Sequence, residues 1–263
     1  MKALSKSTAF KKTTCMGSRS VILGLLMLLA FIPLARAGHF VVGSENINYY
    51  PHYKFVSNQT DKGYVWAVMH AFAKDSGHSF EYKAFPIKRL HRESLEGRID
   101  FSYPDNPSWQ SKERDQTGKI FSDSFITSYG NTMVLATRKS KGLTDFETVA
   151  VPHGFTSVMY AELVAKNRIQ LLEVPDALTA LKLVLMERVD GADVEYNVAN
   201  YLLHQQGLKG VLIHDMSLPS DPVTFHLSTR KHPIIIKQLN QFLSSNTALL
   251  KDLKVAYQLI EPN

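Results

Sequence analysis

The feature that most constrains this chain is a six-residue phrase that occurs twice, as Leu95-Glu-Gly-Arg-Ile-Asp100 and as Leu185-Met-Glu-Arg-Val-Asp190. Each copy ends a stretch with helical apolar spacing and leads into a short apolar run. Each therefore predicts a helix, a tight turn and a strand that enters a sheet. Two such units in one chain predict two α/β lobes, and a cleft between lobes is a common place for a small-molecule site.

The first 37 residues predict export. Five basic residues precede an apolar run at 21–34, and Ala35-Arg-Ala37 follows that run. This is the order of a secretory signal peptide, and the apolar run is too short to favour a membrane span. We expect cleavage after Ala37 and a periplasmic protein, with an uncleaved anchor as the alternative. Cys15, the single cysteine, precedes the cleavage point, so the mature chain has none for a disulfide.

Removal of this segment changes the charge of the protein. Six of the 30 Lys and Arg residues lie in residues 1–37 with none of the 24 Asp and Glu residues, so the formal charge falls from +6 to zero. The basic isoelectric point therefore belongs to the signal peptide. Together with the lack of a basic stripe interleaved with aromatic residues, this argues against a nucleic-acid partner.

Strands and helices alternate along the mature chain, which is typical of parallel α/β sheets. In the first part we expect strands at 40–43, 80–85 and 99–103 and helices at 63–74 and 88–96. A second, equally complete part has expected strands at 132–137, 149–151, 170–174, 189–194 and 211–214 and helices at 157–167, 177–188 and 197–206. After Pro219-Ser-Asp-Pro222 we expect a strand at 224–228 and helices at 232–244 and 247–259, which return to the first lobe.

An ordered set of motifs resembles the bacterial extracellular solute-binding proteins of family 3, the polar amino-acid type. The set spans residues 39–260 and comprises Gly43-Ser-Glu45, Tyr49-Tyr-Pro51, Phe85-Pro-x-x-Arg89, Gly97-Arg-Ile-Asp100, Glu113-Arg114, Phe121-Ser-Asp123, Gly154-Phe-Thr156 and Arg188-Val-Asp190. The resemblance implies the type II periplasmic-binding fold, in which two α/β lobes close around a ligand about a two-segment hinge. The hinge is expected near 127–131 and 217–223. Lobe 1 would comprise 38–127 with 222–263, and lobe 2 would comprise 128–221.

The same resemblance implies site residues. Arg114 matches the arginine that grips the ligand carboxylate, since guanidinium presents parallel donors to a carboxylate. Glu195, five residues after Asp190, matches the acid that meets the ligand ammonium, although it could instead simply begin the following helix. Thr156 matches a hydroxyl residue at a helix N-terminus that contacts a second anionic oxygen, or it caps that helix.

Three further residues complete the expected ligand site. Tyr50 matches the aromatic residue that stacks on the ligand, with Tyr49 and Tyr53 as alternatives. Asp105 lies in the loop that usually meets the ligand. Arg89 is a candidate second anion contact, or it forms an ion pair on the surface of its helix.

Two departures leave the ligand open. Residues 104–112 are longer than in the amino-acid binders, and Ile87 stands where many relatives have Trp or Phe. Asp193 and Glu195 are expected to share one face of a strand, while Asp190 is expected to be a turn residue.

The histidine spacing does not suggest a metal site, and no phosphate-binding glycine loop, dinucleotide fingerprint or nucleophile elbow is present, so we expect no cofactor or metal. The expected function is a monomeric periplasmic protein that captures an amino-acid-like or carboxylate-bearing solute for an ABC permease. The alternatives are a sensing module for a membrane receptor and, with Glu195 or Asp105 as acid–base group, an enzyme of the cyclohexadienyl dehydratase type.

Overall fold

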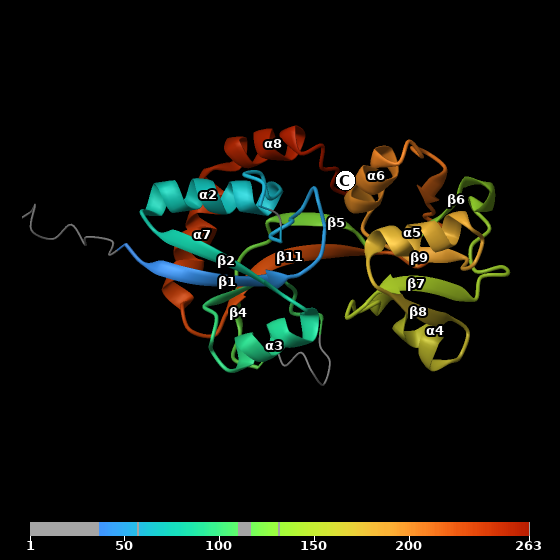
Figure 1. The fold of residues 1–263 in the computed structure, drawn as a ribbon, viewed down its shortest axis with the longest axis horizontal. Coiled ribbons are helices and arrows are strands. Elements are labelled where there is room, and N and C mark those ends of the chain that lie inside the picture. Colours follow the sequence, from blue (N-terminus) through green and yellow to red (C-terminus); the bar gives the residue numbers. More distant parts are fainter. Residues whose placement is uncertain (1–36, 57, 110–116, 131, 263) are drawn as a thin grey trace, which may run out of the picture. The chain divides into compact units, whose positions relative to one another are not determined.

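Two sheets, each with its own helices, build the protein (Figure 1). The structure, a computed structural model, describes residues 37–56, 58–109, 117–130 and 132–262. The predicted fold class, α/β with two lobes, is confirmed. We call the part built on the first sheet lobe 1 and the part built on the second sheet lobe 2.

The sheet of lobe 1 has the strand order β2-β1-β3-β11-β4, with β5 paired to β11. Strands β1, β2 and β3 are parallel, and β11 runs antiparallel to its neighbours. Helices α7 and α8 pack on α2 and β11, so the end of the chain returns to lobe 1. The elements are β1 (His39–Glu45), α2 (Tyr64–Ser76), β2 (Ser79–Phe85), α3 (Ile87–Leu95), β3 (Phe101–Asp105), β4 (Ile120–Phe121), β5 (Ile126–Gly130), β11 (Asp221–Thr229), α7 (Pro233–Ser245) and α8 (Thr247–Ala256).

The sheet of lobe 2 has the order β10-β6-β9-β7-β8, with β7 parallel to both β8 and β9. The helix predicted at 157–167 is shorter than expected, because a 3-10 turn takes up its first residues. The elements are β6 (Thr132–Leu135), η1 (Ala136–Arg138), β7 (Thr148–Pro152), η2 (Val158–Tyr160), α4 (Ala161–Ala165), β8 (Gln170–Val174), α5 (Ala177–Leu185), β9 (Gly191–Asp193), α6 (Tyr196–Gln205) and β10 (Leu212–His214).

The repeated phrase forms the same turn in both lobes. At the end of α3, Gly97 has φ 68° and the Arg98 amide donates to the Glu93 carbonyl at 2.9 Å. At the end of α5, Glu187 has φ 53° and the Arg188 amide donates to the Leu183 carbonyl, also at 2.9 Å. This is the Schellman arrangement, in which a left-handed residue ends a helix.

The aspartate that closes each phrase joins the turn to the neighbouring strand. Asp100 accepts from the Val41 amide of β1 at 2.8 Å, and its own amide donates back to the Val41 carbonyl. Asp190 accepts from the Thr148 amide of β7 at 2.8 Å, and its amide donates to the Thr148 carbonyl. The expectation of a turn role for Asp190 agrees with this geometry, and each lobe starts its central strands in the same register.

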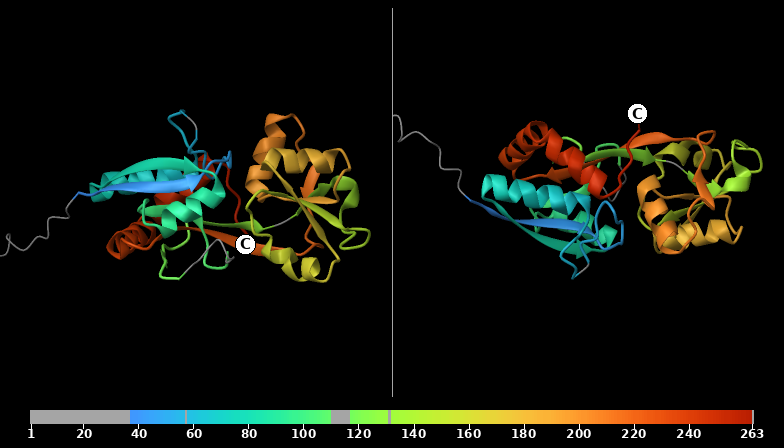
Figure 2. Two further views of the ribbon diagram at one scale, coloured as in Figure 1. Left: turned by 60° about the horizontal axis from the view of Figure 1, so that its bottom comes forward. Right: turned by 90° about the horizontal axis from the view of Figure 1, so that it is seen from above.

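Two strands carry the chain between the lobes. Strands β5 and β11 pair antiparallel from Asp221 opposite Gly130 to Phe225 opposite Ile126, and Figure 2 shows them crossing together. The division expected from the sequence, at 127/128 and 221/222, falls inside this two-stranded ribbon. A change in the twist of the ribbon would therefore move one lobe against the other.

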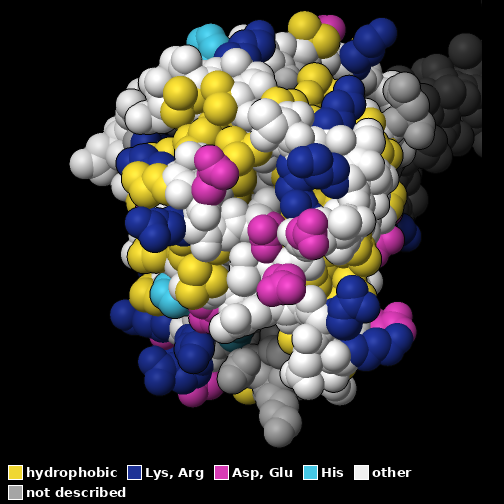
Figure 3. All heavy atoms as spheres, turned by 90° about the vertical axis from the view of Figure 1, so that its right-hand side faces the viewer, with side chains coloured by type: hydrophobic (Ala, Val, Ile, Leu, Met, Phe, Trp, Pro, Cys, Tyr) yellow, Lys and Arg dark blue, Asp and Glu magenta, His cyan; other side chains and the backbone are white. Residues whose placement is uncertain are grey.

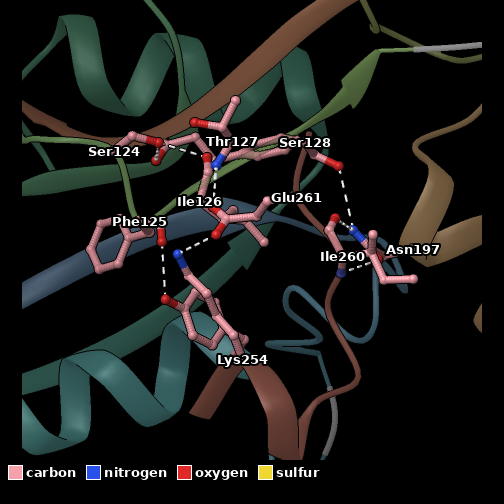
Figure 4. Close-up of polar contacts among 11 residues, drawn as sticks. Ser124, Phe125, Ile126, Thr127, Ser128, Asn197, Lys254, Ile260 and Glu261 are labelled. Atoms are coloured by element: carbon pink, nitrogen blue, oxygen red, sulfur yellow. Dashed lines mark hydrogen bonds and ion pairs between the residues drawn. The ribbon is translucent and has the colours of Figure 1, made fainter. Parts of the chain in front are cut away.

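The C-terminal tail makes a third connection between the lobes (Figure 4). The Ile260 amide donates to Asn197 Oδ1 at 2.8 Å, and Asn197 Nδ2 donates to the Ile260 carbonyl at 3.0 Å. Glu261 accepts from the Thr127 amide of β5 at 3.0 Å and pairs with Lys254 of α8 at 2.6 Å. The tail thus ties lobe 1 to the ribbon and to α6 of lobe 2.

The end face of lobe 2 carries Lys and Arg side chains interspersed with acidic and apolar ones (Figure 3). The part of this face that the structure describes presents no single basic stripe. Within the described ranges, no helix combines the length and the apolar character that crossing a membrane requires.

Candidate functional site

A pocket, with about 720 Å³ of empty space when its opening to solvent is included, lies where the two lobes and the ribbon meet. The pocket receives residues from the carboxyl ends of β1, β3, β7 and β9, which is where open α/β sheets bind ligands. Its described lining is Glu45, Tyr49, Tyr53, Pro104, Trp109, Gly130, Gly154, Phe155, Thr156, Val158, Met159, Asp193, Glu195, Asp221, Val223 and Phe225.

Aromatic rings form much of the wall. Tyr49, from the loop after β1 in lobe 1, meets Phe155 of lobe 2 edge-on with ring centroids 5.5 Å apart. Tyr49 also lies 5.5 Å from Tyr53. Trp109 lies 5.9 Å from Phe225 of the ribbon. The rings give the pocket a largely apolar wall, and the Tyr49–Phe155 contact joins the two lobes directly.

Gly154 allows the lobes to approach each other beside the pocket. It has φ 81°, and a Cβ atom there would lie 2.9 Å from Cγ2 of Ile87 on α3. Ile87, the residue that replaces an aromatic side chain of the family pattern, thus lies against lobe 2 at this glycine and does not appear in the described pocket lining.

The charged residues among the described lining are all acidic: Glu45, Asp193, Glu195 and Asp221. Tyr53 donates to Glu45 Oε2 at 2.5 Å. Burial raises the pKa of Tyr49 well above its usual value, and the carboxylates of Glu195, Asp193 and Glu45 add to this shift. Three carboxylates of the lining therefore act on the Tyr49 hydroxyl, and a hydrogen bond with the Glu195 backbone opposes their effect.

Glu195 is buried and occupied by structural contacts. It caps α6 by accepting from the Val198 amide at 2.8 Å, and it accepts from Asn197 Nδ2 at 2.8 Å. The Ser128 hydroxyl of β5 also donates to it. Nε2 of His52, a fully buried side chain of lobe 1, lies 2.8 Å from Glu195 Oε2. Glu195 therefore begins α6, which is the alternative expected for it from the sequence. Its carboxylate also contacts lobe 1 through His52 and the ribbon through Ser128.

Asp193, at the end of β9, has a different environment. Its carboxylate accepts from the Ser157 hydroxyl, and none of the described Lys, Arg or His side chains forms an ion pair with it. Burial raises the pKa of Asp193 to about 6, against the opposing effect of the Ser157 bond. A carboxylate with so few donors is costly to bury in ionised form.

The other expected site residues are dispersed. Tyr50 is outside the described lining, where it donates to Asp61 at 3.1 Å and contacts the Tyr201 ring at 4.6 Å. Burial, followed by the Asp61 bond, raises the pKa of Tyr50 to about 12. Its neighbours Tyr49 and Tyr53, the alternatives weighed from the sequence, do line the pocket.

Asp105 and Arg89 also lie outside the described lining. Asp105 is buried and accepts from Lys119 Nζ and from the Ser228 hydroxyl, both at 2.6 Å. Arg89 pairs with Glu93 at 3.2 Å on the surface of α3, as in its ion-pair alternative. Thr156 lines the pocket, and the short helix that follows makes no side-chain cap bond. Arg114 lies outside the described residues.

Sequence reasoning missed Trp109, Phe155 and Asp193 as pocket residues. One sequence feature points to Asp193, because alternation along a strand puts it on the same face as Glu195. The spacing does not show which of these two carboxylates has few hydrogen-bond donors. Within the described ranges, no group of His, Cys, Asp or Glu side chains has the arrangement of a metal site.

Comparison with solved structures gives many similar folds. One is the substrate-binding protein of an amino acid ABC transporter, with TM-score 0.64 and 19% identity over 84% of this chain and 99% of that one. A histidine kinase sensor domain with similarity to periplasmic binding proteins has TM-score 0.66 and 19% identity, covering 86% and 98%.

An ancestral amino acid-binding protein described as a precursor of cyclohexadienyl dehydratase has TM-score 0.66 and 18% identity, covering 90% and 99%. No protein-family model and no curated protein matches the chain. At these identities the likeness establishes the fold, which is the periplasmic-binding-protein fold expected from the motifs.

Proposed function

We propose that this protein is a periplasmic solute-binding protein that captures a small polar, amino-acid-like ligand by closing its two lobes. The observation that carries the proposal is the pocket, since lobe 1, lobe 2 and the ribbon all contribute to its wall. A ligand that contacts both lobes only in the closed form stabilises that form by its extra affinity for it. A partner protein would therefore detect ligand binding through the change from the open to the closed form.

The partner we propose is an ABC permease of the inner membrane. A sensory receptor is a second candidate, supported by the likeness to a histidine kinase sensor domain. The protein would reach the periplasm through the signal peptide at 1–37, work as a monomer and use no cofactor. We favour binding over catalysis because the pocket acid Glu195 is engaged by structural donors. The dehydratase alternative has Glu195 or Asp105 as its acid–base group. Asp105 is likewise engaged, by Lys119 and Ser228.

A thermal-shift screen of the purified protein against amino acids, small di-acids, polyamines and short oligosaccharides tests the proposal. A ligand at one hundred times its Kd adds about 2.7 kcal/mol of stability. X-ray scattering should show a smaller radius of gyration with a hit than without. Absence of a shift with every compound would contradict solute binding, and consumption of the compound would favour the enzyme.

Arg114→Ala tests the carboxylate contact that the resemblance implies. Loss of a charge-assisted bond should weaken binding of a carboxylate-bearing hit about 10- to 100-fold, as measured by calorimetry. Arg92→Ala is the matched control, because Arg92 is exposed on α3. Equal affinity in both variants would remove Arg114 from the proposed site.

A further inference from the structure

Two pocket carboxylates, two residues apart in the sequence, have very different sets of partners. Glu195 is held by the Val198 amide, the Asn197 amide group and the Ser128 hydroxyl, and it faces the His52 ring. Asp193 receives one hydroxyl, from Ser157. Glu195 therefore has little capacity left for a ligand, whereas Asp193 still has an oxygen that no described side chain satisfies.

Among the described residues, no Lys, Arg or His side chain supplies a positive partner for Asp193, whose side-chain donor is Ser157. Two titratable groups interact with it, Tyr160 from η2 and Tyr49 from the loop after β1, and the carboxylates of Glu195 and Glu45 act on the same Tyr49. Burial raises the pKa values of both tyrosines, so they stay neutral near pH 7. With the acidic groups close by, a bound cation would lower the cost of keeping Asp193 ionised.

Aromatic side chains complete this part of the pocket. Tyr49 and Phe155 line the same cavity as Asp193 and meet edge-on across the lobes. An ammonium or guanidinium group beside a carboxylate can also lie against aromatic faces, which attract cations. The cavity thus combines an ion-pair partner with a surface for the ligand's apolar part.

Resting on the proposed function, we infer that Asp193 is the residue that selects the ligand, by pairing with a positively charged amine or guanidinium nitrogen of that ligand. Glu195 is then a positioning residue that caps α6 and links the lobes without touching the ligand. The ligand class is an organic cation, either an amino acid bound through a positive nitrogen or an amine that lacks a carboxylate.

The test is calorimetric titration of the wild-type protein, Asp193→Asn and Asp221→Asn at pH 7.5. The probes are L-arginine, L-lysine, L-glutamine, agmatine, putrescine and succinate, of which only succinate lacks a positive nitrogen. We expect at least one of the first five probes to bind, and Asp193→Asn to weaken it about tenfold or more through loss of a charge-assisted bond. Asp221→Asn, which removes another carboxylate of the lining, should change affinity far less.

Two further readouts separate ligand selection from a purely structural role. Asparagine removes a buried charge that lacks a cation, so unliganded Asp193→Asn should melt no lower than wild type at pH 7.5. The wild-type affinity for a bound cation should fall as the pH drops below about 6, the pKa of Asp193. In Asp193→Asn this decrease should be absent. The pair of His52 and Glu195 is present in both proteins, so the difference between the two profiles isolates Asp193.

Several results would overturn the inference. If wild type and Asp193→Asn bound a cationic probe with equal affinity, the inference would be wrong, although the protein would still be a solute-binding protein. The inference would also be wrong if succinate were the only probe that bound. An equal loss of affinity in Asp193→Asn and Asp221→Asn would show that the effect comes from the total charge of the pocket and not from a specific pair with Asp193. If the wild-type protein bound none of the six probes, the inference would be overturned, and only the absence of a shift with every compound of the wider thermal-shift screen would also contradict the proposed function.

Discussion

After each repeated turn a chain segment runs toward the pocket, so the two lobes can be compared position by position from Asp100 and from Asp190. Five residues on, lobe 1 has Asp105 and lobe 2 has Glu195, and both are buried carboxylates that hold several donors. Three residues on, lobe 1 has the fully buried Tyr103, whereas lobe 2 has Asp193 in the wall of the pocket.

This difference shows that the shared phrase determines a turn and not a site. The turn depends on local hydrogen bonds that both lobes reproduce. What happens a few residues later depends on what packs against the strand: β11 and Lys119 beside Asp105, and the ribbon and His52 beside Glu195.

The largest expected effect concerns the two carboxylates at the fifth position. Glu195→Ala and Asp105→Ala should each lower the free energy of unfolding by about 3–5 kcal/mol, because each leaves buried donors or a buried cation without its acceptor. Urea denaturation measures this loss. Glu173→Ala is the control, since Glu173 pairs with His153 at the surface and should cost less than about 1 kcal/mol. If only one of the two variants, Glu195→Ala or Asp105→Ala, lost little stability, the two positions would not be equivalent in the two lobes.

A smaller effect is expected at the aspartates that close the turns. Asp100→Ala and Asp190→Ala should each cost about 2–3 kcal/mol, because strand amides lose their acceptor. Partial burial would raise the pKa of Asp190, but hydrogen bonds from the Glu147 and Thr148 amides lower it overall. Burial likewise opposes the bonds from Lys231 and the Val41 amide, and the pKa of Asp100 is also lowered.

The sign of the pH effect follows from these shifts. A carboxyl with a lower pKa in the folded chain stabilises the fold above its unfolded value, and this stabilisation is lost as the pH falls through the folded value. Wild type should therefore lose stability below about pH 4, and the asparagine variants of these two residues should lose less over the same range. Equal melting profiles between pH 2 and 5 would contradict the role of both aspartates.

The smallest expected effect concerns the left-handed residue of each turn. Glu187→Gly should raise the stability of lobe 2 by about 0.5–1 kcal/mol, because glycine adopts positive φ without the steric cost of a Cβ atom. Gly97→Ala should lower stability by about 1 kcal/mol for the same reason. Met186→Gly, one position earlier and with negative φ, is the control and should not stabilise. A gain in that control would point to an effect on the unfolded chain.

The candidate site was only partly predictable. Thr156 and Glu195 were expected from the motifs, and both line the pocket. Tyr50 was chosen over its neighbours, but Tyr49 and Tyr53 face the pocket, because the loop after β1 turns Tyr50 toward Asp61 and Tyr201. Sequence spacing gives no direction for a side chain on an irregular loop. Arg114 remains a prediction, since the structure does not describe it.

The sequence by itself determined the local elements: the repeated helix–turn–strand unit, the alternation that builds two α/β lobes, and the turn role of Asp190. These features depend on hydrogen bonds and apolar periodicity within a few residues or between neighbouring strands. Only the tertiary structure decided which carboxylates have several hydrogen-bond donors and which rings line the pocket. Those properties depend on donors and rings from distant segments, such as His52 and Ser128 around Glu195, which the fold brings together.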